Sequence, residues 1–308
     1  MLFETQQQRF RNTYDIDNVT TRRELIMLAQ DKLTQESVPS TAKEIEWLLL
    51  EADSISSVEL FSKPNAEVSE PAAQTFEAFV QRRLAREPVQ YILGYTEFFG
   101  LRFSVNPSVL IPRPETELLV EHALDWMAPT EGPVVVDIGT GSGCIAISIK
   151  NARPDAHIVG IDISADALKV ARENAIALNT SITWLEDDLY SKTIFDRLRK
   201  AIGGGGAKLL VSNPPYVTPN EKGSIEPEVF MHEPSEALFA DASGLNPYQA
   251  LAQLGLETLS DTGMLMVENH HDAGRKVEAV FAEAGYIGIE RHRDLSGKDR
   301  FVTARIRV

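Results

Sequence analysis

The second half of the chain alternates strand-like apolar runs with helical segments, and this alternation constrains the fold more than any other feature. Segments such as 165–178 carry apolar residues at helical spacing between the runs. Because neighbouring parallel strands need a crossover connection, usually a helix, this order predicts an α/β domain built on a parallel sheet. The strand-like runs lie at residues 134–136, 157–161, 183–185, 209–211, 263–268 and 301–306.

The first part of the chain has a helical pattern instead. Apolar residues recur at helical spacing over 25–33 and 45–49, and a third helix is expected over 76–84. That helix must stop before Pro88, because proline lacks the N–H that would continue it. These short helices predict a small all-α domain.

Residues 95–105 alternate aromatic and polar side chains around Gly100, which is typical of a β-hairpin. We therefore expect three parts. An N-terminal helical domain spans 1–88, a β-hairpin linker spans 89–112, and the α/β domain spans 113–308.

Net charge and cysteine content limit the kinds of partner and the cell compartment that we expect for this protein. The 308 residues carry a formal net charge of −15 with a sequence pI near 4.9, which argues against a broad electrostatic grip on nucleic acid or on an anionic membrane. One cysteine, Cys144, excludes an intramolecular disulfide framework and favours a reducing compartment. No secretory signal or membrane-spanning run is present, so we expect a cytoplasmic protein without membrane contact.

The stretch Asn213-Pro214-Pro215-Tyr216 directly follows the apolar run at 209–211. Two prolines end a strand there and stiffen the backbone beside an aromatic ring. An asparagine amide, backbone carbonyls and a π-face could together hold a planar group that carries an NH2. A simple proline turn that closes a strand explains the same four residues equally well.

Three alternating glycines join the first strand of the α/β domain to its first helix, in Gly139-Thr140-Gly141-Ser142-Gly143. Glycines at this place permit a tight turn and a close approach of the backbone to a ligand. A plain strand-to-helix turn rarely needs three of them, so a ligand-binding loop is favoured. The same residues also satisfy a relaxed dinucleotide-binding pattern.

Acidic residues follow the next two strands. Asp162 ends the run at 157–161, where its carboxylate could accept both hydroxyls of a ribose, although it could instead cap the following helix, a role that Ser164 fills as well. Residues 186–190 follow the third strand, and Asp188 and the backbone near Leu189 could meet an adenine edge. A solvated acidic loop is an equally good interpretation of that segment.

A nicotinamide-dependent dehydrogenase would need a hydride-accepting site and usually a catalytic acid. After its fourth strand this chain instead has Asn213 followed by two prolines and a tyrosine. A methyl donor therefore fits the crevice better than a dinucleotide.

In combination these motifs resemble the class I S-adenosylmethionine-dependent methyltransferases that modify planar amino groups. A second set resembles one family among them, the HemK/PrmC peptide chain release factor glutamine N5-methyltransferases, from about Ala42 to the C-terminus. That set comprises Arg83, residues 87–94, 98–100 and 110–117, Arg293-Asp294 and Arg300-Phe301.

The resemblance implies a Rossmann-like class I methyltransferase domain preceded by a small all-α domain and a β-hairpin linker. It implies S-adenosylmethionine as methyl donor and the glutamine of the Gly-Gly-Gln loop of class 1 release factors as substrate. The donor site would comprise Gly139, Thr140, Gly141, Ser142, Gly143, Asp162, Leu189 and Asn213. Asn213, Pro214, Pro215 and Tyr216 would hold the glutamine, and Asn213, Pro214 and Tyr216 would act in catalysis.

Alternative substrates are glutamine in a large-subunit ribosomal protein and, less favoured, the N6 amino group of adenine. The related ribosomal-protein family typically has Pro-Arg-Ser-Pro where this chain has Pro112-Arg113-Pro114-Glu115. The acidity of the chain counts against adenine in nucleic acid. A noncatalytic binding module is disfavoured by the presence of both donor and acceptor loops.

Several features depart from the family. Asn269-His270-His271 replaces the usual Glu-x-Gly continuation after Glu268, about forty N-terminal residues have no clear match, and a glycine run occupies 203–206. Adjacent histidines should project differently, so we expect a polar loop at 270–271 and no metal site. Arg113 could position substrate or form an exposed ion pair with Glu115 or Glu117. We expect a monomer.

Overall fold

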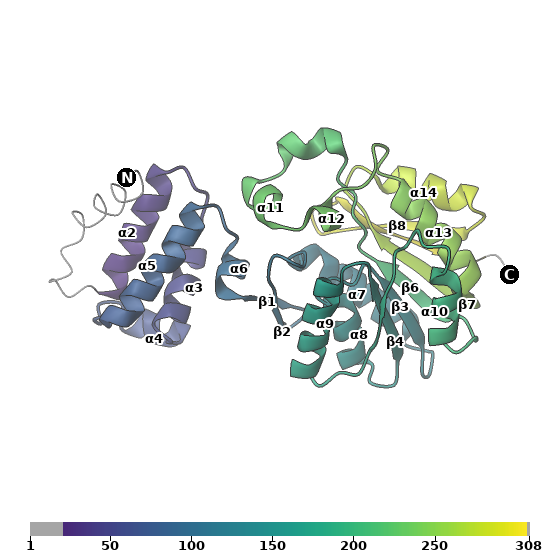
Figure 1. Cartoon of the computed structure of the whole chain (residues 1–308), viewed down its shortest axis with the longest axis horizontal. Helices are drawn as coiled ribbons and strands as arrows, with labels where there is room; N and C mark the ends of the chain where they lie inside the picture. Colours follow the sequence, from purple (N-terminus) through teal and green to yellow (C-terminus); the bar gives the residue numbers. More distant parts are fainter. Residues whose placement is uncertain (1–20, 307–308) are drawn as a thin grey trace. The chain divides into compact units, whose positions relative to one another are not determined.

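The computed structural model describes residues 21–306, which divide between Leu93 and Gly94 into two compact units (Figure 1). Residues 1–20 of the N-terminal extension lie outside the described range. Among the described helices, none is both long and apolar enough to cross a membrane.

The first unit is all α-helical, as the sequence predicts. Thr21 and Thr41 each begin a helix with a capping box, in which threonine and the glutamate three residues later satisfy each other's backbone N–H groups. Leu33, Leu48 and Phe76 are fully buried in its core. Its helices are α2 (Arg22–Gln35), α3 (Ala42–Ala52), α4 (Ser57–Ser62), α5 (Glu70–Leu84) and α6 (Val89–Leu93).

The second unit contains a seven-stranded sheet in the order β5-β4-β3-β6-β7-β9-β8. The five strands from β5 to β7 are parallel, whereas β9 and β8 are antiparallel additions at one edge. The strands are β3 (Val134–Ile138), β4 (His157–Asp162), β5 (Thr183–Glu186), β6 (Ala207–Ser212), β7 (Leu259–Glu268), β8 (Ile287–Arg293) and β9 (Asp299–Arg305).

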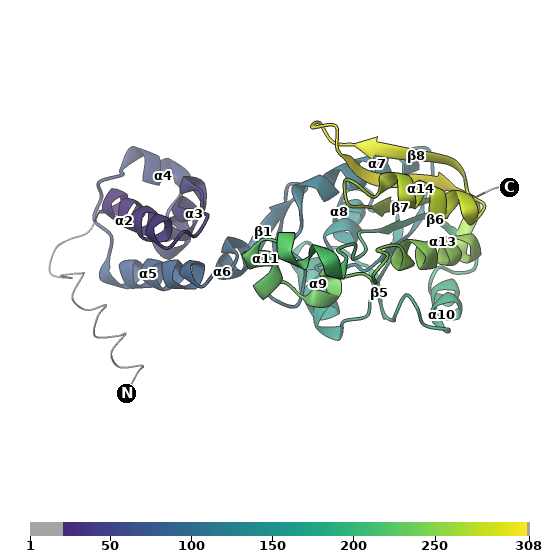
Figure 2. The same ribbon diagram turned by 90° about the horizontal axis from the view of Figure 1, so that it is seen from above.

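Helices cover both faces of this sheet, with α7, α8 and α9 on one side and α10, α13 and α14 on the other (Figure 2). Alternate residues of one strand serve the two cores: Val135 packs with the first group and Val136 with the second. The helices are α7 (Pro114–Met127), α8 (Cys144–Ala152), α9 (Ala165–Ala177), α10 (Ile194–Ala201), α13 (Asn246–Thr258) and α14 (Gly274–Glu283). This arrangement confirms the predicted α/β fold.

The predicted hairpin is present as β1 (Tyr95–Phe98) and β2 (Leu101–Ser104). It belongs to the second unit, since Phe98 and Phe103 are buried in the core that contains α7 and α8. Asn174 of α9 fixes its end by accepting from the Ser104 N–H at 2.8 Å and donating to the Ser104 carbonyl.

Two parts of the second unit were not expected from the sequence. Strand β8 lacks an apolar run because it lies at the edge of the sheet, where most of its side chains are at least partly exposed. Residues 217–245, named here the cap segment, contain a 3₁₀ helix, η1 (Pro219–Ser224), and two short helices, α11 (Pro227–His232) and α12 (Ser235–Leu238). The glycine run at 203–206 is a loop before β6, as predicted.

Candidate active site

Strand register brings the two loops singled out in the sequence to neighbouring positions. β3 pairs with β6 in parallel, and Ile138 lies opposite Ser212. The glycine loop (139–143) and the Asn-Pro-Pro-Tyr loop (213–216) therefore leave adjacent strands at the same carboxyl edge. The Ser212 hydroxyl donates to the Ile138 carbonyl at 2.7 Å and joins the two strand ends. This is also the point where the strand order reverses, the usual ligand crevice of open α/β sheets.

The glycine loop leaves room for a ligand at two of its glycines. Gly139 and Gly141 have φ of 70° and 54°, and no heavy atom lies within 4 Å of the place where a Cβ would stand. Gly143 differs, because a Cβ there would lie 2.9 Å from Ile147 Cδ1. Backbone conformation thus demands glycine at all three positions, and helix packing demands it again at the third.

Two buried polar side chains hold this loop in place. Thr140 Oγ1 donates to Asp137 Oδ2 at 2.6 Å, and Asn174 donates to the Ser142 carbonyl at 2.9 Å. Asp137 is fully buried, and desolvation raises its pKa to about 7. Asp137 lies two residues before the glycine loop in the sequence, and no pattern there assigns it a role. Asn174, on a helix 32 residues beyond Ser142, gave no signal at all.

Asp162 lies at the end of β4, beside the glycine loop. Its Oδ2 accepts from the Gly141 N–H at 2.8 Å and its Oδ1 from the Ser164 N–H at 3.0 Å. Ser164 is the N-cap of α9, because its side chain accepts from the Ala167 N–H. The alternative of Asp162 as helix cap is therefore wrong, and its carboxylate keeps lone pairs for a ligand. Burial raises the pKa of Asp162.

The acidic segment after β5 lies next to Asp162. The Asp187 N–H donates to the Asp162 carbonyl at 3.0 Å, and the Asp187 carboxylate pairs with Arg197. Asp188 Oδ1 accepts from the Tyr190 N–H, so this carboxylate shapes the turn. Leu189 is half-buried against the core beside α10 and α13.

The four residues after β6 differ in exposure. Pro214 is buried, while Asn213, Pro215 and Tyr216 are half-buried. Asn213 Nδ2 donates to Thr116 Oγ1 at 3.4 Å, and within residues 21–306 no group donates to Asn213 Oδ1. Burial raises the pKa of Tyr216 to about 12, so the phenol stays neutral at physiological pH. Asn213 therefore presents a hydrogen-bond acceptor beside a neutral aromatic ring.

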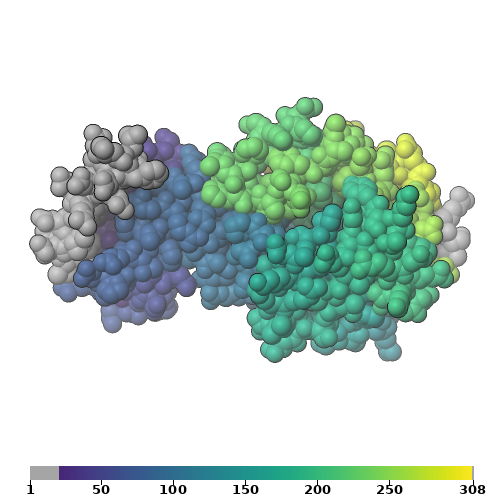
Figure 3. Space-filling view, in the orientation of Figure 1, coloured from purple at the N-terminus to yellow at the C-terminus, as the bar shows by residue number. Residues whose placement is uncertain are grey.

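Arg113 pairs with Glu233 of the cap segment, so the alternative of an exposed ion pair with Glu115 or Glu117 is wrong. Glu233 also accepts from the Ile111 N–H at 3.2 Å, and its side chain is only 1% exposed. Glu117 instead accepts from the Phe99 N–H. The ion pair ties the start of α7 to the cap segment, which lies in the green part of the molecular surface (Figure 3).

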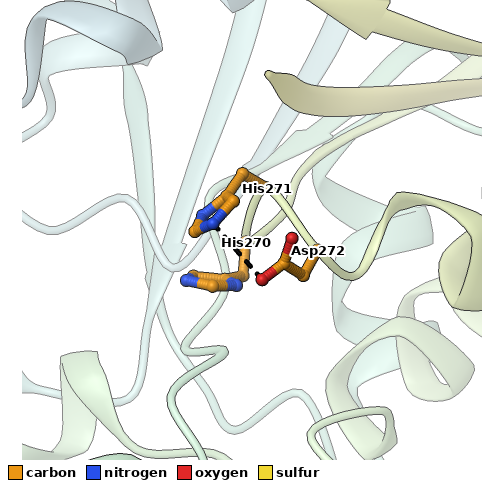
Figure 4. Close-up of side chains that lie close together, drawn as sticks. All are labelled: His270, His271 and Asp272. Atoms are coloured by element: carbon orange, nitrogen blue, oxygen red, sulfur yellow. Dashed lines mark ion pairs between the residues drawn. The ribbon is translucent and has the colours of Figure 1, made fainter. Parts of the chain in front are cut away.

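His270, His271 and Asp272 gather in the turn after β7 (Figure 4). The His270 ring lies 6.0 Å from the Tyr216 ring, measured between their centroids. The two imidazole rings lie 4.1 Å apart, contrary to the expectation that adjacent histidines project differently. His271 Nε2 contacts Asp272 Oδ2 at 3.3 Å. Desolvation and the neighbouring His271 lower the pKa of His270, which favours the neutral form of this ring beside the loop at 213–216.

Known proteins match both parts of the chain. A family model named PrmC N-terminal domain matches residues 24–94, and one named methyltransferase small domain matches residues 114–241. The release factor glutamine methyltransferase of Neisseria gonorrhoeae is 38% identical, with 83% of this chain and 90% of that protein covered. The protein of the same name from Geobacter sulfurreducens is 35% identical, with 94% and 98% covered.

The first of these matches corrects one expectation. Because it begins at residue 24, residues 24–40 are not an unmatched extension. Helix α2, which spans most of that stretch, packs in the core of the first unit through Ala29 and Leu33.

Proposed function

The chain belongs to the release factor glutamine methyltransferase family, and we propose that its loop at 213–216 presents the glutamine of a release factor to the methyl donor. The protein is an S-adenosylmethionine-dependent methyltransferase acting on a glutamine side-chain amide of release factors. We propose the finer target to be N5 of the glutamine in the Gly-Gly-Gln loop of class 1 factors. The observation that carries the proposal is the pairing of β3 with β6, from which both loops emerge.

The residues of the glycine loop fit the donor. Gly139 and Gly141 leave open space above the backbone, and the Asp162 carboxylate beside them can accept from ribose hydroxyls. We propose that Gly139, Thr140, Gly141, Ser142 and Gly143 line the donor site together with Asp162, Leu189 and Asn213. When bound, S-adenosylmethionine supplies a sulfonium-activated methyl group.

A glutamine amide nitrogen is a weak nucleophile, because its lone pair is delocalised into the carbonyl. Orientation is therefore the main task of the protein. We propose that Asn213 Oδ1 and the Pro214 carbonyl accept the two amide hydrogens, which aims the nitrogen at the methyl group. Tyr216 packs against the flat amide, and Pro215 keeps the loop rigid. The N-methylated amide cation is a strong acid, so no strong general base is needed.

The remaining expectations extend this proposal. We propose that the helical domain docks the release factor, that the enzyme works as a monomer in the cytoplasm, and that it does not bind nucleic acid directly. The strong net negative charge supports the last point. The translation-related names of the relatives support the cytoplasm.

Incubation with radiolabelled donor and separate acceptors tests the function. Release factor, large-subunit ribosomal protein and DNA are supplied in parallel, and we expect label in the release factor alone. Label in the ribosomal protein or in DNA, with none in the release factor, would replace the proposed substrate by that alternative.

A further inference from the structure

We propose that Thr116 and Glu268 are positioning residues that hold the Asn213 side chain in the one orientation that leaves its oxygen free for substrate. The inference rests on the proposed function of the loop at 213–216. It assigns roles to two side chains from elements that the glutamine-binding motif does not include.

The three side chains form a hydrogen-bonded cluster, in which the Asn213 amide also interacts directly with the Glu268 carboxylate. Thr116 Oγ1 donates to Glu268 Oε2 at 2.6 Å, and Asn213 Nδ2 donates to Thr116 Oγ1 at 3.4 Å. Thr116 is 2% exposed and Glu268 is 5% exposed, so water does not compete freely for these groups.

Thr116 and Glu268 are placed next to Asn213 by two different elements. Thr116 lies in the first turn of α7, and its N–H donates to the Arg113 carbonyl at 3.1 Å. Glu268 is the last residue of β7, and its neighbour Val267 lies opposite Ser212. Glu268 and Asn213 therefore follow paired residues on adjacent strands. No short-range sequence pattern connects these three positions.

The number of protons on each group determines which way the hydrogen bonds among these three side chains run. A threonine hydroxyl has one proton, and above the raised pKa of Glu268 this proton points to an ionised carboxylate, which accepts and cannot donate. The lone pairs of the hydroxyl then face Asn213, so only the NH2 side of the amide can turn toward them. A flipped amide would set Oδ1 against an oxygen without a proton. The outward Oδ1 can thus accept a substrate amide hydrogen without reorganisation.

Burying the Glu268 carboxylate lowers the stability of the fold, and the proposed positioning role explains why the residue is there. Within residues 21–306 no Lys, Arg or His forms an ion pair with it, since the nearby Arg300 pairs with Glu115 and Asp294. A buried carboxylate without a cation lowers stability. Side chains that lower stability in this way are expected at functional sites.

The decisive variant is Thr116→Val, which keeps the shape and removes the hydroxyl. We expect kcat on release factor to fall about 10-fold, the loss of roughly one hydrogen bond, with the Kd for S-adenosylmethionine unchanged by calorimetry. Thr116→Ser restores the hydroxyl and should recover kcat to within about 3-fold of the original protein. Glu268→Gln can donate to Thr116 and so permits the flipped amide, and we expect it to lower kcat as well.

Thr258→Val is the matched control. Thr258 is equally buried and its hydroxyl donates to the Leu254 carbonyl at 2.7 Å, but it lies at the amino end of β7, away from the loops. We expect its kcat to equal that of the original protein. Combined with Asn213→Ala, Thr116→Val should cause no further loss, because Thr116 acts through Asn213.

A second measurement does not depend on the substrate. Hydrogen exchange of the Asn213 side-chain NH2, followed by NMR, should be slow in the original protein and faster in Thr116→Val. Equal exchange in the two proteins, an unchanged kcat in Thr116→Val, or additive losses in the double variant would each overturn the inference. An original protein that labels no release factor, yet shows the expected exchange difference, would overturn the proposed function alone.

Discussion

Asn213 is useful because its neighbours leave it one free acceptor on a backbone that prolines hold still. Replacing it by alanine removes that acceptor but leaves the glycine loop intact. We expect Asn213→Ala to lower kcat by roughly 100-fold or more, while calorimetry shows nearly unchanged binding of S-adenosylmethionine. Turnover equal to that of the original protein would remove Asn213 from the mechanism.

Asp162 serves both the glycine loop and, as we propose, the donor. Asp162→Ala removes the acceptor for the Gly141 N–H as well as the ribose contact. We expect donor Kd to rise at least about 10-fold, since each charge-assisted bond contributes roughly 1.5 to 3 kcal/mol. Ser164→Ala removes only the cap of α9 and provides the control. Equal donor affinities in the two variants would reassign Asp162 to a purely structural role.

Asp137 should make stability depend on pH. Its pKa is raised to about 7 in the folded protein from an ordinary value of 3.8, so the folded state holds the proton more tightly. Its contribution is fully present below about pH 4 and is lost as pH rises through about 7, by up to roughly 4 kcal/mol at 1.36 kcal/mol per pKa unit. Glu268, whose pKa is also raised to about 7 by burial, adds a slope of the same sign.

Denaturant unfolding at pH 5 and pH 8 measures this effect. We expect the original protein to be less stable at pH 8, and Asp137→Asn to lose less stability between the two values. Asparagine can still accept from Thr140 and carries no charge to desolvate. Parallel pH dependences in the two proteins would contradict the account.

At the scale of elements, the ion pair of Arg113 with Glu233 joins the cap segment to the start of α7. Arg113→Ala would leave the Glu233 carboxylate buried without a cation, whereas Glu233→Gln keeps the bond from the Ile111 N–H. We expect the arginine variant to lose more stability, about 2 kcal/mol after allowance for the partial exposure of Arg113. Arg293→Ala is the control, because Arg293 is exposed and its partner Asp299 keeps a second ion pair with Arg291.

Hydrogen exchange read by mass spectrometry locates the effect. Arg113→Ala should speed exchange within residues 217–245 and leave the peptides of β3 and β4 protected. Uniform acceleration through the second unit, or none, would show that the pair does not hold the cap segment specifically.

The sequence predicts those elements correctly whose local residue pattern is compatible with only one type of secondary structure. The alternating runs predicted the parallel strands, and the Gly100 hairpin and the loops after β3 and β6 were also predicted correctly. Short cap helices gave no periodicity to detect, and the edge strand β8 gave no apolar run. The partners of Asn213 and Arg113 lie 97 and 120 residues away, so only the folded chain reveals them.

For the whole molecule, the position of the methyl group in the reaction product is the most direct test of the proposed function. The sheet brings the glycine loop and the loop at 213–216 together, and the relatives are named release factor glutamine methyltransferases. Tandem mass spectrometry of release factor treated with this protein and S-adenosylmethionine can locate the added methyl group. We predict a single methyl on the side-chain nitrogen of the Gly-Gly-Gln glutamine, absent with Asn213→Ala. A methyl group on any other residue, or on the same glutamine with undiminished yield from Asn213→Ala, would contradict it.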